Sequence, residues 1–311
     1  MQETLLRAWR GLPGFDGRSA LRSWLYRIAT NACLNAIKKR PKRVLPIDYG
    51  GSSTDPHDAA AQPLVESVWI EPYPDEMLAS DDGTTAPAAR YEQRESMELA
   101  FVAALQHLPA NQRAALILSE VLGFSAREIA DSLETTTASV NSALQRARKL
   151  VDERLPDESQ QATLRSLGDE ELNAVVERYM QAFEQADVDA LVAMLSDDAS
   201  WSMPPQPAWF RGHEAIVGFL VENPLRYFRW RHLPTWANGQ PAVGCYSWDE
   251  SRGRFVAHSL DVLTLRGPRI SEVVSFLDVT RRGLEDQGFT SFVQGGLFRS
   301  FGQPDELRSE R

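Results

Sequence analysis

Apolar residues recur with helical spacing between Ser125 and Leu150. Ser125 and Glu128 have the spacing of a capping box, in which a hydroxyl and a carboxylate each bind a free backbone N–H at a helix start. The short helix that follows has one apolar face, made of Ile129, Ala130 and Leu133. After the polar break at Glu134–Thr136, a second helix has a buried stripe of Val140, Leu144, Ala147 and Leu150. This pattern predicts a helix-turn-helix that fits a major groove, and a plain helical hairpin in a bundle is the alternative.

Two more helices are predicted in the first 40 residues. One spans residues 2–10 and stops at the loop sequence GLPG. The other runs from about Ala20 to Arg40, with a buried face of Leu21, Trp24, Leu25, Ile28, Ala29, Ala32 and Ile37. Its other face and the KKRPKR run that follows are rich in cations and amides. A solvated helix end would account for the charge, but aromatic, amide and cationic side chains together suit melted or single-stranded DNA.

Periodicity is lost from Val44 to about Pro87, so a linker over residues 44–89 is predicted. Its segment VWIEPYPDEM holds large apolar side chains. Trp69, Pro72 and Tyr73 are therefore candidates for an anchor that docks on another part of the protein or on a partner, and a chance cluster in a disordered segment is the alternative. Helices at Arg90–Leu108 and Asn111–Leu122 complete a domain over residues 90–155, and a polar hinge is expected at 156–168.

Residues 169–311 change character, because helices are followed by strands. Two helices are predicted within Asp169–Leu195 and another at His213–Val221. The predicted strands are Ala199–Met203, Arg226–Ala237, Ala242–Trp248, Phe255–Leu265 and Ile270–Asp278. This order indicates an α+β domain. Five large apolar residues in the last stretch predict that the tail packs somewhere, namely Phe289, Phe292, Leu297, Phe298 and Phe301.

A ligand pocket in this domain has five candidate residues, which are Trp201, Trp230, Tyr246, His258 and Asp261. The aromatic members would look the same in an ordinary core. His258 and Asp261 lie three residues apart on one predicted strand, so they face opposite sides of the sheet unless a bulge intervenes. We therefore expect a regulatory protein–protein role, not catalysis.

Composition and charge narrow the class of protein. The chain has 311 residues and a net charge of −10, and it contains no apolar run of about 18 residues, so we expect two or three domains and no membrane association. Residues 1–43 carry a net charge of +8 and residues 44–98 a net charge of −10, which suits a polyanion-binding surface beside an acidic segment. Cys33 and Cys245 are expected to be buried thiols in a cytoplasmic protein. The sequence suggests neither a cofactor nor a metal.

Two segments resemble the extracytoplasmic-function (ECF) group of sigma-70 factors: residues 2–40 resemble region 2, and residues 105–150 resemble region 4. The resemblance implies that region 2 binds core RNA polymerase and the melted −10 promoter element, while region 4 binds the −35 element. For the −10 element the implied residues are Trp24, Arg27, Asn31, Asn35, Lys38, Lys39 and Arg40. For the −35 element they are Ser125, Thr137, Ser139, Asn141, Ser142, Gln145, Arg146 and Lys149. For polymerase they are Leu5, Trp9, Arg10, Phe15 and Arg18.

The chain departs from the pattern of this group at two places. Met1 falls in the middle of region 2, so we expect apolar side chains such as Leu5, Trp9 and Leu25 to be under-covered. In the helix-turn-helix, Glu134 stands where a turn glycine is common, and Asn141 and Ala143 stand where Lys and Arg are frequent. Fewer phosphate contacts would weaken promoter binding and flatten its salt dependence.

Residues from about 169 to 280 resemble the SnoaL-like group of cone-shaped α+β folds, some of which are cyclases that use an Asp and a His. The Trp-Pro element in the linker resembles one that contacts such a domain in other ECF factors. The hypothesis is thus a multidomain ECF sigma factor with all-α region 2 (residues 1–43) and region 4 modules, regulated in cis by its C-terminal domain and a candidate ligand. The alternatives are a ligand-responsive regulator that acts without polymerase and a SnoaL-like enzyme fused to a DNA-binding module.

Overall fold

The computed structural model describes residues 2–17, 20–37, 43–60, 69–77, 98–155, 158–278 and 296–308. Several residues singled out from the sequence lie outside this described part, namely Arg18, Lys38, Lys39, Arg40, Phe289 and Phe292. The chain forms two compact units. Unit 1 comprises Met1–Lys42 and Ala100–Pro156, and unit 2 comprises Arg43–Leu99 and Asp157–Arg311.

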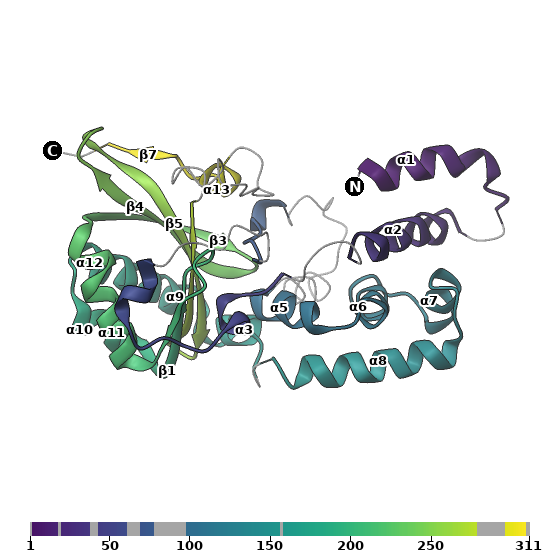
Figure 1. Ribbon diagram of the computed structural model, residues 1–311, viewed down its shortest axis with the longest axis horizontal. Helices are drawn as coiled ribbons and strands as arrows, with labels where there is room; N and C mark the ends of the chain where they lie inside the picture. Colours follow the sequence, from purple (N-terminus) through teal and green to yellow (C-terminus); the bar gives the residue numbers. More distant parts are fainter. Residues whose placement is uncertain are drawn as a thin grey trace. The chain divides into compact units, whose positions relative to one another are not determined.

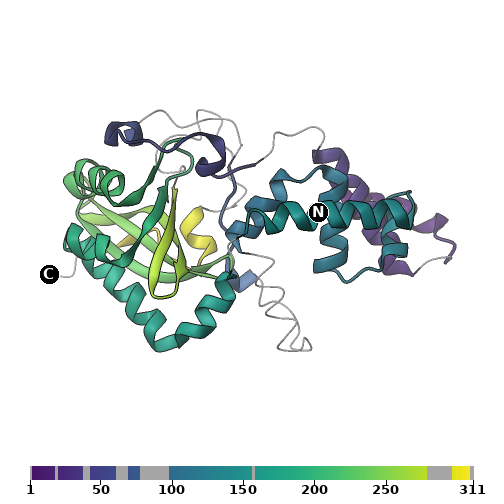
Figure 2. The ribbon, with the colours of Figure 1, turned by 90° about the horizontal axis from the view of Figure 1, so that it is seen from below.

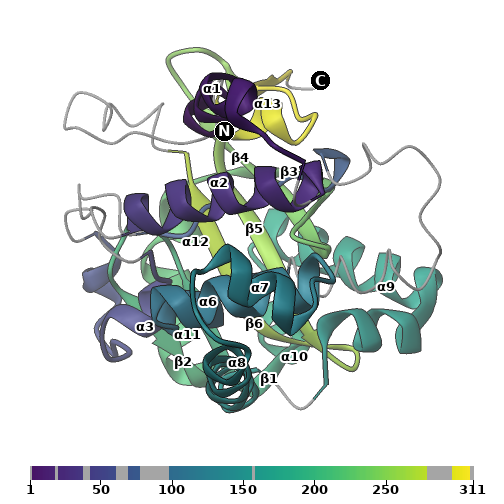
Figure 3. The same cartoon turned by 90° about the vertical axis from the view of Figure 1, so that its right-hand side faces the viewer.

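Unit 1 is helical. It contains α1 (Gln2–Gly11), a 3₁₀ turn (Leu12–Gly14), α2 (Leu21–Ile37), most of α5 (Leu99–His107), α6 (Ala110–Leu116), a π-helical turn (Ile117–Val121), α7 (Ala126–Ser132) and α8 (Thr137–Asp152). Figures 1 and 3 show α2 against α6 and α7, with α1 on its outer side and α8 on the far side of the α6–α7 layer. Each helix predicted for this part has a counterpart with other bounds: the one expected at Arg90–Leu108 is seen from Leu99, and residues 90–97 and 38–40 lie outside the described part.

The core of unit 1 lies between α5, α6, α7 and α8. Its buried residues include Leu108, Leu116, Ile129, Val140, Leu144, Ala147 and Val151. Helices α1 and α2 are poorly covered, as expected: Leu5 is 61% exposed, Trp9 76% and Leu25 37%. No residue of α2 is fully buried in the described part of that helix. For the same reason the prediction that Cys33 is buried is wrong, because its thiol lies on this uncovered helix and is exposed.

Unit 2 is built on one sheet. Its strands are β1 (Leu195–Ser202), β2 (Trp209–Arg211), β3 (Trp230–Ala237), β4 (Gln240–Asp249), β5 (Arg254–Arg266), β6 (Arg269–Leu277) and β7 (Glu306–Leu307). The order is β2-β1-β6-β5-β4-β3, with β7 on β5, and only the β1–β6 pair is parallel. The short β2 and β7 were not predicted, and β3 begins later than expected because Pro224–Tyr227 forms the helix α12.

Helices α9 (Gln160–Glu184), α10 (Val188–Met194) and α11 (Gly212–Glu222) pack against the sheet. Gly168 interrupts α9 with a φ of +76°, a conformation that glycine adopts without steric cost. Figure 2 shows the two halves of α9, in teal, meeting at an angle. The first half occupies the segment where a polar hinge was expected, and Gln160, Gln161 and Thr163 are buried there because they bond to or pack on the sheet.

Both faces of the sheet are covered. All residues of β4 from Gln240 to Ser247 are buried, whereas an antiparallel strand with one solvated face would alternate. One face carries the cone helices. The other receives the C-terminal segment with α13 (Leu297–Ser300). Segments of the predicted linker with α3 (Pro46–Tyr49) and 3₁₀ turns at Pro56–Ala60 and Asp75–Met77 also belong to unit 2, and the turn Pro56–Ala60 contacts α11. These parts of the linker are therefore folded into unit 2.

Candidate nucleic-acid interface and cone pocket

The helix-turn-helix has the capping geometry expected from its sequence. The Ser125 Oγ accepts a hydrogen bond from the Glu128 backbone N–H at 3.3 Å, and the Glu128 Oε2 accepts one from the Ser125 N–H at 2.9 Å. Thr136 caps α8 through the backbone N–H of Ser139 at 3.2 Å. Between the helices Glu134 has a φ of +52°, so the position where a glycine is common is indeed left-handed.

Helix α8 presents a continuous polar surface, here called the recognition face. It consists of residues that are all exposed, namely Thr137, Ser139, Asn141, Ser142, Gln145, Arg146 and Lys149. Ser125, at the start of α7, is exposed as well. Beside this face the Arg148 guanidinium binds Glu120 Oε1 through Nε at 3.2 Å and Nη2 at 2.5 Å. This ion pair reduces the positive charge next to the recognition face, which already has few cations.

Helix α2 places the residues predicted for melted DNA at intervals of four. Arg27 and Asn35 are exposed and Asn31 is half-buried, so the three share one face. The half-buried Trp24 ring packs against Phe15 with centroids 5.3 Å apart. The Phe15 ring is therefore partly covered by Trp24 inside the α1–α2 hairpin. Leu5, Trp9 and Arg10 are exposed on α1.

The predicted linker anchor, residues 69–77, packs against the rest of unit 2. Trp69 and Ile70 are 5% and 4% exposed, and Pro72 is buried too. The Tyr73 N–H donates to Asn238 Oδ1 and the Tyr73 carbonyl accepts from the Asn238 N–H, both at 2.9 Å. Asp75 Oδ1 accepts a hydrogen bond from the Gly239 N–H at 2.8 Å. The anchor is therefore hydrogen-bonded to the β3–β4 turn.

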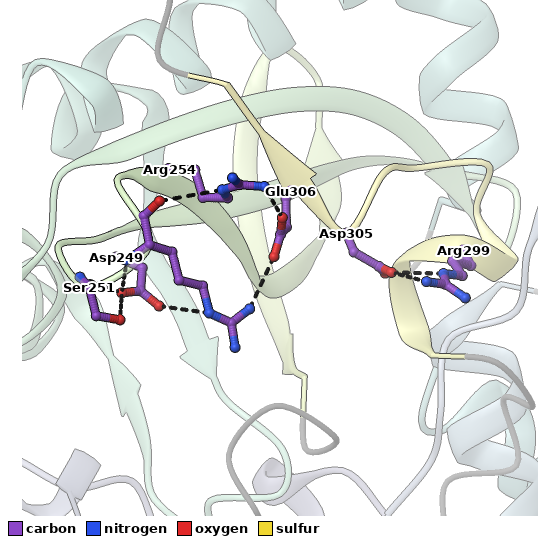
Figure 4. Close-up of polar contacts among 7 residues, drawn as sticks. Asp249, Ser251, Arg254, Arg299, Asp305 and Glu306 are labelled. Atoms are coloured by element: carbon purple, nitrogen blue, oxygen red, sulfur yellow. Dashed lines mark hydrogen bonds and ion pairs between the residues drawn. The ribbon is translucent and has the colours of Figure 1, made fainter.

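The C-terminal segment, residues 296–308 and here called the tail, also packs on the sheet. Leu297, Phe298 and Phe301 are buried, which confirms the prediction for these three residues. Glu306 forms ion pairs with Arg254 at 2.8 Å and Arg252 at 3.0 Å, and Asp305 pairs with Arg299 (Figure 4). Because these pairs are at the surface, the apolar contacts account for most of the attachment.

A buried polar joint connects the segments on either side of region 4 in sequence. Glu98, 4% exposed, accepts hydrogen bonds from the backbone N–H groups of Gln160 at 3.2 Å and Gln161 at 2.8 Å. The Leu99 N–H donates to Gln240 Oε1 at 2.9 Å, and Gln160 Nε2 donates to the Leu265 carbonyl at 2.8 Å. Sequence reasoning missed this joint, because isolated polar residues give no sign of such distant partners.

The cone face of the sheet brings together four of the five predicted pocket residues. Trp201 and Trp230 belong to the core against α9, and Asp261 Oδ2 accepts from the Tyr179 hydroxyl at 2.8 Å. A register shift in β5, between the pairs Cys245–Ser259 and Tyr246–Ala257, leaves His258 in a bulge. His258 thereby lies 4.9 Å from the Trp230 ring and 3.1 Å from Ser247 Oγ, on the same face as Asp261. The bulge therefore allows His258 and Asp261, three residues apart on β5, to face the same side of the sheet.

Tyr246 does not join this set. Strand alternation directs it to the opposite face, where its ring lies 5.0 Å from Phe298 and its hydroxyl donates to the Pro304 carbonyl at 2.8 Å. The prediction that Tyr246 lines the pocket is therefore wrong, because its side chain packs against the tail.

The apolar interior of the cone contains a small hydrogen-bonded polar cluster around Asp261. Burial raises the pKa of Tyr179 well above its usual value, with a contribution from Asp261, and burial likewise raises the pKa of Cys245. Both groups therefore stay protonated, and Ser259 Oγ adds a bond of 3.2 Å to Asp261. A hollow of about 310 Å³ lies beside Trp230, Phe228 and Arg229. Within the described ranges no cluster of His, Cys, Asp or Glu is arranged to hold a metal ion.

Comparisons with known families agree with this division of the chain. Residues 1–43 match Sigma-70 region 2, residues 98–151 match Sigma-70 region 4, and residues 176–273 match the SnoaL-like domain. The chain is 40% identical to the ECF RNA polymerase sigma factor SigG of Mycobacterium tuberculosis over 309 residues, which are 99% of this chain and 77% of that protein. The chain belongs to the ECF family of RNA polymerase sigma factors.

Other relatives match about half of the chain. The RNA polymerase sigma-H factor of Pseudomonas aeruginosa is 30% identical over 154 residues, 50% of this chain and 70% of that protein. The crystal structure of the sigma factor SigJ of M. tuberculosis covers 91% of this chain and 88% of its own, with a TM-score of 0.53 and 19% identity. That likeness extends the ECF fold, with a C-terminal α+β domain, to nearly the whole chain. Among the described residues no helix is sufficiently long and apolar to cross a membrane.

Proposed function

We propose that this ECF factor binds core RNA polymerase and directs it to promoters. The exposed recognition face of α8 carries the proposal, because it presents amide, hydroxyl and cationic groups on a helix-turn-helix that matches region 4. The residues on α8, together with Ser125, would contact the −35 element. Trp24, Arg27, Asn31 and Asn35 of α2, with Lys38, Lys39 and Arg40, would contact the −10 element. Leu5, Trp9, Arg10, Phe15 and Arg18 would contact polymerase.

The C-terminal domain is proposed to regulate these modules in cis. The support is the construction of unit 2, in which the linker anchor, the two flanks of region 4 and the tail are all bonded to one sheet. Any ligand or partner that loosens this sheet face changes the tether of both sigma modules at once. The fraction of chains with restrained sigma modules would then fall, and the fraction with released modules would rise.

The C-terminal domain is proposed to be non-catalytic. Tyr179 and Asp261 bind one another and His258 binds Ser247, so the groups best suited to proton transfer have separate structural partners. A small molecule in the hollow beside Trp230 remains a proposal. So do the domain limits at residues 1–43, 44–89, 90–155, 156–168 and 169–311, and the cytoplasmic location that work on RNA polymerase would require.

Run-off transcription with bacterial core RNA polymerase tests the proposal. The full chain is compared with chains ending at Leu167 and at Gly288, and capture of core polymerase by each chain is measured in parallel. We expect all three chains to bind polymerase and the shortened ones to differ from the full chain in transcript yield. Equal yields would reject regulation in cis, and DNA binding without polymerase capture would favour a conventional regulator. The Asp261→Asn variant checks for enzymatic activity, since turnover that it abolishes without changing transcription would favour an enzyme.

A further inference from the structure

A groove lies in the elbow between α9 and α10 of unit 2. The turn between these helices is tight: Ala186 has a φ of +54°, and the Asp187 N–H donates to the Ala182 carbonyl at 2.8 Å. Helix α10 is thereby folded back beside α9, and the β5–β6 turn closes the groove with Pro268 and Arg269. The groove has a volume of about 480 Å³, which is within the usual range for small-molecule sites.

This groove is separate from the interior of the cone. Its lining includes no member of the polar cluster around Asp261, and it shares only Gln185 with the hollow beside Trp230. The floor is apolar, because Ala182 and Met194 are buried there at 5% and 9% exposure. Most apolar residues of the lining are alanines, whose small side chains leave the space open.

Helix α9 contributes a polar wall to the groove. Arg178, Gln181 and Gln185 follow at spacings of three and four residues, so they share one face of the helix. The Arg178 Nε donates to the Ala174 carbonyl at 3.2 Å. Its two terminal nitrogens have neither a hydrogen-bond nor an ion-pair partner among the residues that the structure describes. Arg178 therefore offers a guanidinium edge to a ligand.

The β5–β6 turn contributes a second guanidinium. Arg269 Nη1 donates to the Leu195 carbonyl at 3.3 Å and lies 3.7 Å from Asp197 Oδ1, on a side chain that is 95% exposed. Within the described part, Asp187 is the one carboxylate of the lining, and its Oδ1 already accepts the Ala190 N–H at 2.9 Å as the cap of α10. The lining thus sets two guanidinium groups against a single carboxylate, which favours an anion.

We propose that this groove binds a small organic anion, namely a carboxylate or a phosphate monoester with a compact apolar body. A planar guanidinium donates two parallel hydrogen bonds to either head group, so Arg178 and Arg269 would hold the charge. The two glutamine amides would bind further polar atoms, and the apolar body would lie on Ala182 and Met194. This combination of an apolar floor with a few convergent polar groups is typical of small-molecule sites.

The groove adjoins the strand pair that carries the buried joint. Arg269 precedes Ile270, which pairs with Leu265, and the Leu265 carbonyl accepts from Gln160 Nε2 at 2.8 Å. An anion that bridges α9 and the start of β6 would therefore stiffen the strands to which the flank of region 4 is bonded. This regulatory consequence rests on the proposed control in cis, whereas binding of the anion does not.

Methyl NMR of the full chain tests the site with phenylacetate and phenyl phosphate as probes, which separate a carboxylate head from a phosphate head. The Met194 methyl lines the groove and the Met203 methyl lies in the core of the cone, so the two signals distinguish the two locations. We expect saturable shifts at Met194 only. Arg178→Gln and Arg269→Gln, both at exposed positions, should each weaken binding about tenfold or more. Arg211→Gln, at an exposed arginine on β2, should leave it unchanged.

Inorganic phosphate and benzyl alcohol are the matched fragments, one without the apolar body and the other without the charge, and each should bind more weakly than the probes. The absence of saturable shifts at Met194 with both probes up to about 10 mM would overturn the proposal. So would undiminished binding by both arginine variants, or shifts confined to Met203.

Run-off transcription with core polymerase tests the regulatory consequence separately. A probe that binds should change the transcript yield of the wild type and not that of Arg178→Gln. Binding at Met194 without any change in yield would count against the proposed control in cis, while the NMR result would still establish the site.

Discussion

Units 1 and 2 are stabilised in different ways. In unit 1 the functional groups lie on the surface of short helices, and their placement follows from local signals such as the Ser125–Glu128 capping box and the Thr136 cap. In unit 2 the important contacts join residues far apart in the chain, as in the bonds from Glu98 to Gln160 and from Tyr73 to Asn238. The comparison indicates that local signals place the proposed DNA-binding groups, whereas the proposed control in cis depends on long-range packing.

The largest effect is expected from breaking the joint of unit 2 at Glu98. Glu98→Ala leaves two buried backbone N–H groups without an acceptor, at a cost of about 3 kcal/mol in the free energy of unfolding. Glu98→Gln keeps an acceptor and should cost about 1 kcal/mol. Urea denaturation followed by hydrogen exchange of the β5 and β6 amides measures both. If the two variants lose the same stability, the joint does not work through these bonds.

Glu272 makes the stability of unit 2 depend on pH. Burial raises the pKa of this carboxyl from 4.5 to about 7, helped by the charge of Asp48 in the linker segment. Because the folded state holds the proton more tightly, stability is highest below about pH 4.5 and falls as the pH rises through about 7. Glu272 keeps some contact with solvent, so we expect Glu272→Gln to add about 2 kcal/mol at pH 8 and less than about 1 kcal/mol at pH 5.

Thermal unfolding at both pH values measures this difference, with the exposed Glu214→Gln as control. An equal gain at pH 5 and pH 8 would show that ionisation of Glu272 plays no part.

A substitution beneath the tail tests whether packing on the sheet contributes more to tail docking than the surface ion pairs do. A Cβ at Gly244 would lie 3.2 Å from Phe298 Cε1 and 3.3 Å from Gln303 Oε1. We expect Gly244→Ala to weaken tail docking by about 1–2 kcal/mol and to speed tryptic cleavage after Arg299. Gly218→Ala is the matched control, because no atom lies within 4 Å of its new methyl group. Unchanged cleavage in Gly244→Ala would mean that the tail is held in another way.

The smallest expected effect is local and concerns unit 1. Glu134 adopts a left-handed conformation that costs an L-residue about 1–2 kcal/mol. Part of the gain from glycine is lost to the greater freedom of the unfolded chain, so Glu134→Gly should stabilise region 4 by about 0.5–1 kcal/mol. Hydrogen exchange of the α6–α8 amides measures it. Ala186→Gly, also at positive φ, should stabilise unit 2 alone, and a gain in unit 1 from that variant would contradict the explanation.

Sequence reasoning predicted the local features of unit 1 better than the long-range contacts of unit 2. The helix-turn-helix, the exposed residues of α8 and the under-covered α1 were predictable, because capping and helical spacing are local signals. The bulge at His258 and the turn of Tyr246 toward the tail were not, since a single register shift between β4 and β5 decides which face a residue occupies. The contact of α2 with the helix-turn-helix was also missed, because Arg22 and Tyr26 look like ordinary helix residues until Phe124 is placed beside them.

The most direct test of control in cis is run-off transcription by Gly244→Ala, in which one added methyl group disturbs the tail and leaves every predicted DNA contact intact. We predict that the variant binds core RNA polymerase as well as the wild type and yields several times more transcript, while Gly218→Ala matches the wild type. Equal yields from Gly244→Ala and the wild type, in samples where proteolysis shows that the tail is released, would contradict the claim that the C-terminal domain restrains the sigma modules.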